Sequence, residues 1–490
     1  MGSTKTLAKD SVIYGGSTIL VKMVSWLLTT LFTYTLTKAE YGMMTNLYAY
    51  VAVIMIILTF GMETGFFRFV NQTEKYKVHT VYSTAIIVVS SFVALFLFVF
   101  LTFLPSIRPW IWNDEIPDAY IRLVIVIMSM DAFSAIPFAY LRYKKRPVRF
   151  GFLKILNVVL YTVFCLFFLL VCPEINERNP QWIAWFWKGD SLLYYVFISN
   201  LLATAIQTMC LLPELLGFRY TFDKVLAKTM LKYCFPLVIM GLAGMSNQVV
   251  DKLVFPVVYP DKEMMFEELG IYSGCFKLAL IMMMFTQAFR YAYEPFLFEK
   301  SKDKNAPETY AVIMKYFIIL GLLVFLGVMF YLDIFKYFIS PEYFVGLPIV
   351  PIVLMGELFF AIYFNLSVWY KLNDKTYWGA IFSLIGFVVI ITINVVFIPQ
   401  YSYMACAWAA FAGNGLIMIL SYFIGQKEYP VKYDLKTIGL YFGLALSLYG
   451  ISCLVYIENT ALKISFNTLL LALYLIVVLK RDIKVLSFRK

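Results

Sequence analysis

Long apolar runs alternate with short polar segments along the whole chain. Each run has about the twenty residues that a helix needs to cross the ~30 Å hydrocarbon core of a bilayer. The pattern predicts an all-α polytopic membrane protein with about fourteen transmembrane helices. The predicted spans are residues 11–36, 43–67, 80–104, 119–141, 150–171, 191–212, 231–257, 270–297, 310–332, 346–370, 377–398, 402–424, 437–457 and 462–479.

The basic residues between these runs predict the orientation of the spans. Most of the 41 Lys and Arg residues lie in or beside segments that share a side with the N-terminus, whereas Asp and Glu show no such bias. Cytoplasmic loops of membrane proteins carry an excess of Lys and Arg. We therefore expect a multi-pass plasma-membrane protein with both termini in the cytoplasm.

Composition agrees with a membrane protein. Hydrophobic residues make up 62% of the chain and charged residues only 14%, far from the usage of soluble domains. In a soluble protein the net charge of +11 would suggest a nucleic-acid partner. Here basic clusters such as residues 142–146 flank the spans, where topology and anionic headgroups explain them. We expect no nucleic-acid partner.

The segments between spans offer little for catalysis. The longest, residues 172–190, is too short for a domain, and the only histidine, His79, lies in another short loop. The long loop carries Trp182, Trp185 and Trp187, which are typical of an anchor at the membrane interface, with sugar binding as the alternative. The seven cysteines form no CxxC pair and predict neither disulfides nor a metal site. We therefore do not expect an enzyme.

Ionisable residues inside the apolar runs are costly, at roughly 3 kcal/mol each at the centre of a helix. Acids and bases among them nearly balance, so we expect the interior to be wet, internally paired, or both. These residues are Lys22, Glu63, Asp131, Asp251, Lys252, Lys277, Arg290, Glu294 and Glu357.

Two helical faces gather such charges with other polar residues. In the first span, Lys22 lies midway along a series of small and polar residues that recur every three or four positions and so share one face. Small-residue packing explains the Ser, Thr and Gly members, but Lys22 favours a cavity. In the eighth span, Lys277, Gln287, Tyr291 and Glu294 share a face.

The embedded carboxylates are candidates for ion pairing or for coupling. Arg290 precedes Glu294 by four residues, a spacing that suits an intrahelical ion pair. Asp251 lies one turn from Asn247, and it either pairs with Lys277 or, as a carboxylate beside an amide, binds Na⁺ or H⁺. No cofactor beyond such a coupling ion is expected. The coupling or gating candidates are Asp251, Asn247, Glu294, Asp131 and Glu357.

A short motif recurs at a shift of 228 residues. Glu40-Tyr41-Gly42 precedes the second span, and Glu268-Leu269-Gly270 precedes the eighth. The recurrence predicts two parallel six-span units around a central site. We expect an N-lobe at 1–228, a C-lobe at 229–425, and an added helix pair with a cytoplasmic tail at 426–490.

These motifs, with others, resemble those of a known family. The others are the Asp251 span, Tyr293-Glu294-Pro295-Phe296, and residues 394–399 followed by 403–407. Over essentially its whole length the chain resembles the bacterial polysaccharide (O-antigen) flippases, Wzx-like, of the multidrug/oligosaccharidyl-lipid/polysaccharide (MOP) exporter superfamily. It looks most like the lipopolysaccharide-biosynthesis flippases of Bacteroidetes-type bacteria. Ser402 and Ala405 depart from the family's usual glycines.

The resemblance implies two six-helix lobes in a V-shaped arrangement that alternates between inward-facing and outward-facing states. It implies a flippase that moves undecaprenyl-pyrophosphate-linked oligosaccharide across the bacterial inner membrane. Its implied partners are membrane lipid and polysaccharide polymerase or assembly proteins. Cations in a water-filled cavity would meet the pyrophosphate, and amide and aromatic groups would meet the sugars. The substrate-binding candidates are Lys22, Lys277, Arg290, Gln287, Tyr291 and Trp26.

Two other function classes compete with this one. A multidrug exporter (MATE-like) of the same superfamily, coupled to a cation, would usually have twelve spans and an acidic cavity, which the last two spans and the embedded lysines disfavour. A membrane enzyme acting on lipid-linked glycans would need acidic or His residues on a water-facing loop, and the loops here supply few.

Overall fold

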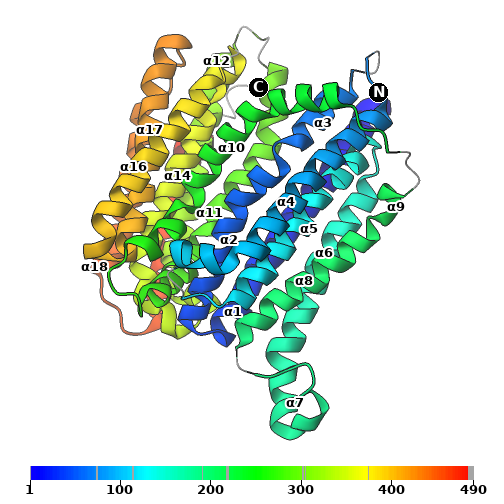
Figure 1. Ribbon diagram of the computed structural model, residues 1–490. Coiled ribbons are helices and arrows are strands. Elements are labelled where there is room, and N and C mark those ends of the chain that lie inside the picture. Colours follow the sequence, from blue (N-terminus) through cyan, green and yellow to red (C-terminus); the bar gives the residue numbers. More distant parts are fainter. Residues whose placement is uncertain are drawn as a thin grey trace. The chain divides into compact units, whose positions relative to one another are not determined.

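The computed structural model describes residues 2–72, 75–112, 115–189, 191–216, 220–300, 303, 305–373 and 375–483. Within these ranges the chain is helical and contains no strand, and most helices run roughly along one direction within their bundle (Figure 1). The longer helices are α1 (Gly2–Thr35), α2 (Lys38–Thr59), α4 (Val78–Trp112), α5 (Asp118–Tyr143), α6 (Pro147–Leu166), α8 (Leu192–Cys210), α10 (Lys224–Val258), α11 (Met265–Lys300), α12 (Ala306–Phe330), α14 (Val350–Leu366), α16 (Tyr377–Tyr401), α17 (Tyr403–Glu428), α18 (Leu435–Leu454) and α19 (Thr460–Val478).

Short α-helices, 3-10 helices and π-helical turns connect or extend these elements. They are α3 (Met62–Val70), η1 (Phe167–Val171), α7 (Cys172–Arg178), η2 (Pro180–Trp182), α9 (Leu212–Leu215), α13 (Leu332–Phe335), η3 (Lys336–Phe338), η4 (Pro341–Ile349), α15 (Val368–Leu372) and η5 (Leu479–Ile483).

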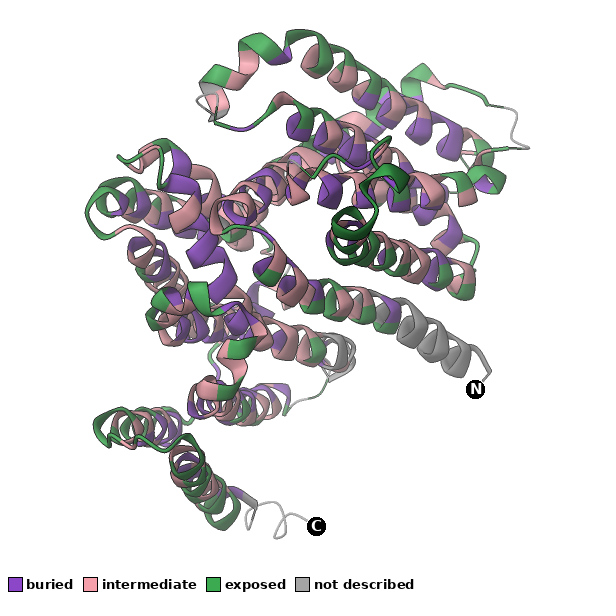
Figure 2. Ribbon diagram, turned by 90° about the horizontal axis from the view of Figure 1, so that it is seen from below, coloured by how far each residue is buried: buried purple, intermediate pink, exposed green. Residues whose placement is uncertain are grey.

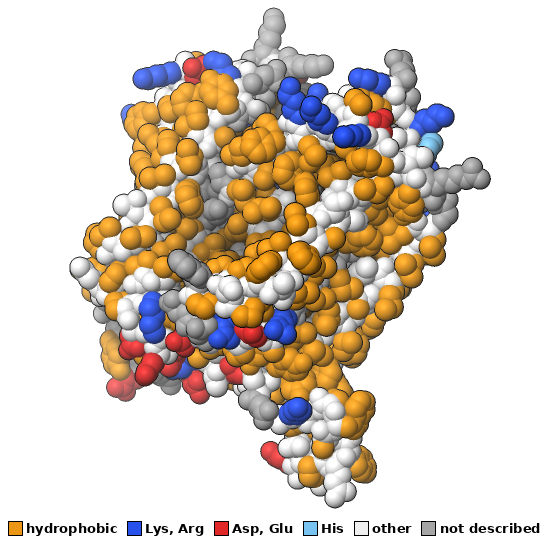
Figure 3. Space-filling view, in the orientation of Figure 1, with side chains coloured by type: hydrophobic (Ala, Val, Ile, Leu, Met, Phe, Trp, Pro, Cys, Tyr) orange, Lys and Arg blue, Asp and Glu red, His pale blue; other side chains and the backbone are white. Residues whose placement is uncertain are grey.

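The spans expected from hydropathy are present as helices. In the described part of the chain, thirteen helical segments are long and apolar enough to cross a membrane. The remaining predicted span, 11–36, falls on α1, whose apolar described portion is the shorter segment Ile19–Thr35. The expectation of an all-α, multi-pass membrane protein is confirmed. Figure 3 shows the hydrophobic side chains that cover the middle of the visible face.

The second predicted span, 43–67, is interrupted. Phe60 and Gly61 both adopt left-handed backbone conformations, with φ of 50° and 63°, so α2 ends there and α3 starts at Met62. Two consecutive left-handed residues cannot continue a right-handed helix. Gly61 takes this conformation at little cost, whereas Phe60 is an unusual residue for it. The single helix expected from the apolar run is therefore wrong at this point.

Contacts divide the chain into two compact units. Unit 1 is residues 1–257 with 261–270, and unit 2 is residues 258–260 with 271–490. In unit 1, α5, α6 and α8 pack on one another, and α1 packs on α6. In unit 2, α17 packs between α14 and α16, and α18 and α19 pack on α12. Figure 2 shows buried positions on the sides of helices that face neighbours within each bundle.

These units are defined by contacts, and they assign α10 to unit 1. Near its start, α10 packs on α3, where the Arg68 guanidinium lies 4.2 Å from the centre of the Tyr233 ring. Near its end it is bonded to α2, because the Asn46 amide donates to the Lys252 carbonyl at 2.7 Å. The lobes expected at 1–228 and 229–425, with the helix pair at 426–490, stay a prediction.

Polar side chains fasten the C-terminal helix pair to α12. The Asn467 amide donates to the Phe330 carbonyl at 2.9 Å, and the Tyr474 hydroxyl donates to the Ile319 carbonyl at 3.0 Å. Near the chain's end, the buried Asp482 forms an ion pair with Lys315 and accepts from the Tyr441 hydroxyl. Hydrogen bonds to helix backbone are a usual way to join helices in hydrocarbon, so α18 and α19 are an integral part of unit 2.

The long loop of unit 1 is an ordered extension. Helix α6 continues through the π turn η1 into α7, which projects beyond the start of α8 (Figure 1). Trp187 is buried and stacks on Tyr195, whose hydroxyl accepts from the Lys188 N–H at 2.7 Å. Trp182 and Trp185 are 71% and 83% exposed. Their role as an interfacial anchor stays a prediction, and Trp187 instead holds the loop to α8.

Candidate functional site

The two copies of the recurring motif meet one another in unit 1. A Cβ added to Gly42 would lie inside 3.0 Å of the Phe266 carbonyl oxygen, and one added to Gly270 would lie equally close to the Lys38 carbonyl oxygen. Lys38 and Phe266 are 228 positions apart, as are Gly42 and Gly270. The contact is therefore reciprocal, as expected where equivalent helices of a repeat cross. Only glycine allows backbones to approach this closely.

A polar cluster surrounds this crossing of α2 and α11, which we call the glycine crossing. Lys38 forms an ion pair with Glu267 across it. Glu40 caps α2 by accepting from the Thr37 N–H at 3.1 Å, while the Thr37 hydroxyl accepts from the Glu40 N–H at 3.2 Å. The other Glu40 oxygen accepts from the Ser191 hydroxyl at 2.7 Å. Thr37 and Glu40 form a reciprocal capping box that fixes the start of α2. The hydrogen bond from Ser191 links this helix start to the start of α8.

Asp251, a coupling candidate, is buried in α10 and paired with its neighbour in sequence. The Lys252 ammonium lies 3.0 Å from one Asp251 oxygen and 3.2 Å from the other. Because Asn46 bonds to the Lys252 carbonyl, the pair is linked to α2. Asp251 lies seven residues before the end of α10, about 10 Å along the helix.

A second group of charges lies in the interior of unit 1. Asp131 on α5 is half-buried and interacts electrostatically with Lys154 on α6. The Lys154 ammonium lies 4.0 Å from the centre of the Phe138 ring. Nearby on the same bundle, Arg142 pairs with Glu63. Two of the embedded acids, Asp131 and Glu63, thus lie beside basic residues of the same unit.

The polar face of α1 divides into two parts. Thr29 and Thr33 are buried among neighbouring helices, which fits the packing interpretation of that face. Lys22 is exposed and Trp26 is half-buried. The lining of a cavity by Lys22 and Trp26 stays a prediction.

In unit 2, two cations approach one aromatic ring. The Arg290 guanidinium of α11 lies 3.7 Å from the centre of the Phe364 ring, and the Lys371 ammonium of α15 lies 4.1 Å from it. The two positive charges therefore lie within about 8 Å of each other, at a ring whose face attracts cations. We call Arg290 and Lys371 the cation pair.

The other candidates of unit 2 are half-buried along the same bundle: Lys277 and Gln287 on α11, and Glu357 on α14. The side chains of Asn247, Tyr291 and Glu294 lie outside the described residues. The ion pair expected between Arg290 and Glu294 therefore stays a prediction.

Sequence reasoning missed two charged residues. Lys154 lies near the start of the span 150–171, where a lysine within an apolar run is the available signal. Lys371 lies just past a predicted span, where a basic residue is ordinary, so its approach to Arg290 depends on tertiary structure. Within the described ranges, no three His, Cys, Asp or Glu residues cluster as metal ligands.

The fold is similar to that of solved membrane transporters. It is similar to the lipid II flippase MurJ in its inward closed conformation, with a TM-score of 0.73 and 14% identity, over 96% of this chain and 100% of MurJ. An inward-facing multidrug MATE transporter of the MOP superfamily matches with a TM-score of 0.66 and 10% identity, over 85% of this chain and 94% of that one.

A MATE transporter in complex with MaD3S matches with a TM-score of 0.56 and 12% identity, over 86% of this chain and 95% of that one. No protein-family model and no curated protein matches the sequence. These structural neighbours are transporters and a flippase, and at such identities they show the fold alone.

Proposed function

We propose that the protein is a flippase that moves undecaprenyl-pyrophosphate-linked oligosaccharide from the inner to the outer leaflet of a bacterial inner membrane. The observation that carries this proposal is the extent of the fold likeness. The likeness to the lipid II flippase covers 96% of this chain, whereas the likeness to the multidrug transporters covers about 85%. A lipid-linked substrate is also consistent with a chain that has few groups for catalysis.

The cation pair supports a substrate with a pyrophosphate. The Arg290 guanidinium and the Lys371 ammonium both lie beside the Phe364 ring, so this part of unit 2 offers two positively charged donor groups to an anionic ligand. A pyrophosphate offers several acceptor oxygens for a guanidinium and an ammonium. In this proposal, Arg290 and Lys371 bind the headgroup of the carrier lipid in unit 2.

The glycine crossing supports alternating access. If the N-terminus is cytoplasmic, as the distribution of basic residues predicts, the start of α2 and the start of α11 lie on the outer side of the membrane. Their close backbone contact and the Lys38–Glu267 ion pair hold these two helix ends together. In this proposal the contact closes the outer side and opens once per cycle, while Asp251 with Lys252 couples the change to an ion or proton.

A binding experiment tests the substrate class. Purified protein in nanodiscs is titrated with undecaprenyl pyrophosphate, with undecaprenol, and with a lipophilic cation. The proposal expects undecaprenyl pyrophosphate to bind best and the double variant Arg290→Gln/Lys371→Gln to weaken that binding about tenfold or more. Lys427→Gln is the matched control, since Lys427 is an exposed cation of the same unit.

The multidrug transporters among the structural neighbours favour a second candidate function, the export of cationic drugs. Tight binding of the lipophilic cation, with no preference for undecaprenyl pyrophosphate over undecaprenol, would support that function and contradict the flippase proposal.

A further inference from the structure

A groove lies between α1 and α6 of unit 1. Its volume is about 550 Å³ and it is open along one side. Gly16 and Ser17 of α1 and Gly151 of α6 form its small-residue walls. A Cβ added to Gly16 would meet no atom within 4 Å, which shows that this glycine faces open space. The groove is present because Gly16, Ser17 and Gly151 have small side chains or none, so side-chain atoms do not fill the space between the two helices.

The other residues of the groove are apolar and accessible. Leu20 projects from α1, and Val148 and Phe152 project from α6. All three are exposed, Val148 at 71% and Phe152 at 60%. The groove residues of α6 lie within its first three turns, so the groove runs about 10–12 Å along the helix. Its chemistry suits a hydrocarbon chain.

The α6 end of the groove adjoins three consecutive cations. Lys144, Lys145 and Arg146 are exposed and form the turn between α5 and α6, immediately before Pro147 and Val148. The Lys144 N–H donates to the Tyr140 carbonyl at 2.9 Å, and the Arg146 N–H donates to the Leu141 carbonyl at 3.0 Å. These bonds define a tight turn that presents its side chains outward. We call Lys144, Lys145 and Arg146 the basic turn.

Lys145 is an unexpected residue for its backbone conformation. Its φ is 52°, in the left-handed region that glycine or asparagine adopts with less strain. A strained non-glycine residue is a pointer to function. Here the chain keeps a positive charge where a glycine would complete the turn more easily.

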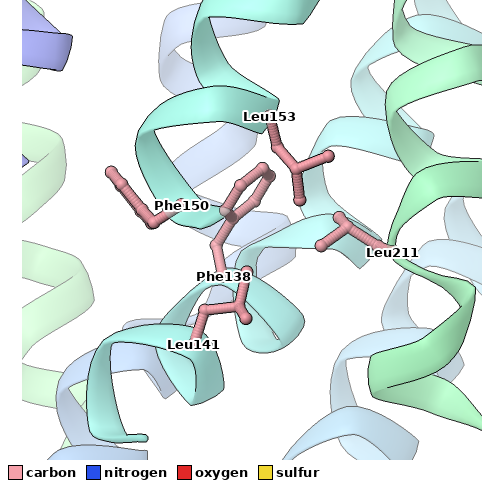
Figure 4. Close-up of a cluster of buried hydrophobic side chains, with 5 residues drawn as sticks. All are labelled: Phe138, Leu141, Phe150, Leu153 and Leu211. Atoms are coloured by element: carbon pink, nitrogen blue, oxygen red, sulfur yellow. The ribbon is translucent and has the colours of Figure 1, made fainter. Parts of the chain in front are cut away.

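The basic turn is held on a packed base. Phe138 and Leu141 of α5, Phe150 and Leu153 of α6, and Leu211 form a buried cluster (Figure 4). This cluster joins the end of α5 to the start of α6. The cations and the groove therefore belong to one firmly packed part of unit 1.

We propose that the groove and the basic turn bind the carrier lipid in the inner leaflet before it is moved: the groove takes the first isoprene units, and the basic turn takes the pyrophosphate. This inference rests on the proposed function and adds a docking site on unit 1. Charge complementarity supports an anionic headgroup. A single groove suits a lipid with one chain per headgroup better than a phospholipid with two.

The test is photo-capture of undecaprenyl pyrophosphate that carries a diazirine in its first isoprene units. Full-length protein is placed in phosphatidylcholine nanodiscs, and cross-linked peptides are identified by mass spectrometry. In the wild type, cross-links should fall on α1 and α6. Gly16→Leu places a side chain in the groove at a position where an added Cβ meets no atom within 4 Å, and it should lower capture about tenfold.

Charge is tested in parallel. The triple variant Lys144→Gln/Lys145→Gln/Arg146→Gln should lower capture about tenfold or more. Gly443→Leu is the control for Gly16→Leu, since a Cβ there also meets nothing within 4 Å. Lys427→Gln/Lys432→Gln/Lys436→Gln removes the same charge from another exposed loop region. Both controls should capture the lipid as the wild type does.

Three results would overturn the inference: unchanged capture by both test variants, cross-links outside α1 and α6, or equal competition by phosphatidylglycerol, which would identify a general anionic-lipid surface. Flipping by the wild type in proteoliposomes is measured alongside. If the wild type flips and both test variants capture normally, the groove inference fails and the proposed function stands. If the wild type captures through the groove but does not flip, the proposed function fails and the lipid site stands.

Discussion

The close backbone contact at the glycine crossing predicts that Gly42→Ala disfavours the state in which α2 and α11 touch. The new methyl group would lie inside 3.0 Å of the Phe266 carbonyl oxygen and 3.0 Å from the Gly270 nitrogen, whereas ordinary contacts are 3.4–4 Å. Because the neighbouring atoms are backbone, the two helices must separate by on the order of 1 Å. Overpacking of this kind costs about 1–3 kcal/mol, and the cost falls only on the state in which the helices touch. The closed contact should therefore lose about 5–150-fold in population relative to open states.

The assay is cross-linking of Lys38→Cys with Glu267→Cys by a short bifunctional thiol reagent, in a background without native cysteines. These positions form an ion pair across the crossing, so the cross-linking rate reports the fraction of closed contact. Gly42→Ala should slow cross-linking and lower transport, and Gly270→Ala should do the same because the contact is reciprocal.

Gly443→Ala is the control for this experiment, since a Cβ there meets nothing within 4 Å. Each of Gly42→Ala, Gly270→Ala and Gly443→Ala stabilises the helical conformation by about 1 kcal/mol. A loss of helix stability therefore cannot explain a difference between these variants. If Gly42→Ala and Gly270→Ala both leave cross-linking and transport unchanged, the close backbone contact does not control the closed state.

Three further predictions concern charged residues. Asp251→Asn should destabilise the fold by about 1–3 kcal/mol, since it weakens a buried charged hydrogen bond, and adding Lys252→Met should restore the melting temperature but not transport; full transport by the single variant would remove Asp251 from coupling. Asp482→Asn should cost about 3–5 kcal/mol, because it leaves the lysine partner of a buried ion pair uncompensated, and thermal unfolding in detergent measures this; an unchanged melting temperature would contradict it. Burial alone would raise the pKa of Asp333, but hydrogen bonds and charge from Lys463 and another lysine outweigh it and lower the pKa below its ordinary 3.8. A carboxyl whose folded pKa is lowered stabilises the fold above its unfolded pKa. The hydrogen-exchange protection factors at the start of α19, which are corrected for intrinsic exchange at each pH, should therefore fall as the pH falls below about 4, and Asp333→Asn should remove that fall.

The membrane spans were predictable because each rests on the summed hydropathy of about twenty residues. Single substitutions change such a sum little, and each predicted run falls on helical segments, although the run 43–67 is divided between α2 and α3. The break after α2 was not predictable, because the apolar run continues through Phe60 and Gly61. A left-handed phenylalanine leaves no signal in hydropathy, and a single glycine in an apolar run is compatible with a continuous helix.

Pairings between charged side chains were only partly predictable. Asp251 and Lys252 are adjacent in sequence and point from neighbouring faces of the helix. The Lys252 side chain is nevertheless long enough for its ammonium to reach the Asp251 carboxylate. The approach of Lys371 to Arg290 depends on how α14 and α15 pack against α11, which spacing along one helix cannot reveal. The sequence showed that Gly42 and Gly270 recur, but only the structure shows that they touch.

Movement of a lipid-linked oligosaccharide between leaflets can be measured in reconstituted vesicles. Purified protein is reconstituted into vesicles with a fluorescent undecaprenyl-pyrophosphate-linked oligosaccharide, and the label exposed on each leaflet is followed with an impermeant quencher. We expect the fraction of label that the quencher reaches from one side to change faster than in protein-free vesicles. We also expect that Arg290→Gln/Lys371→Gln slows the change and that Lys427→Gln does not. Accessibility that stays at the protein-free rate, in vesicles shown to contain folded protein, would contradict the proposed flippase function.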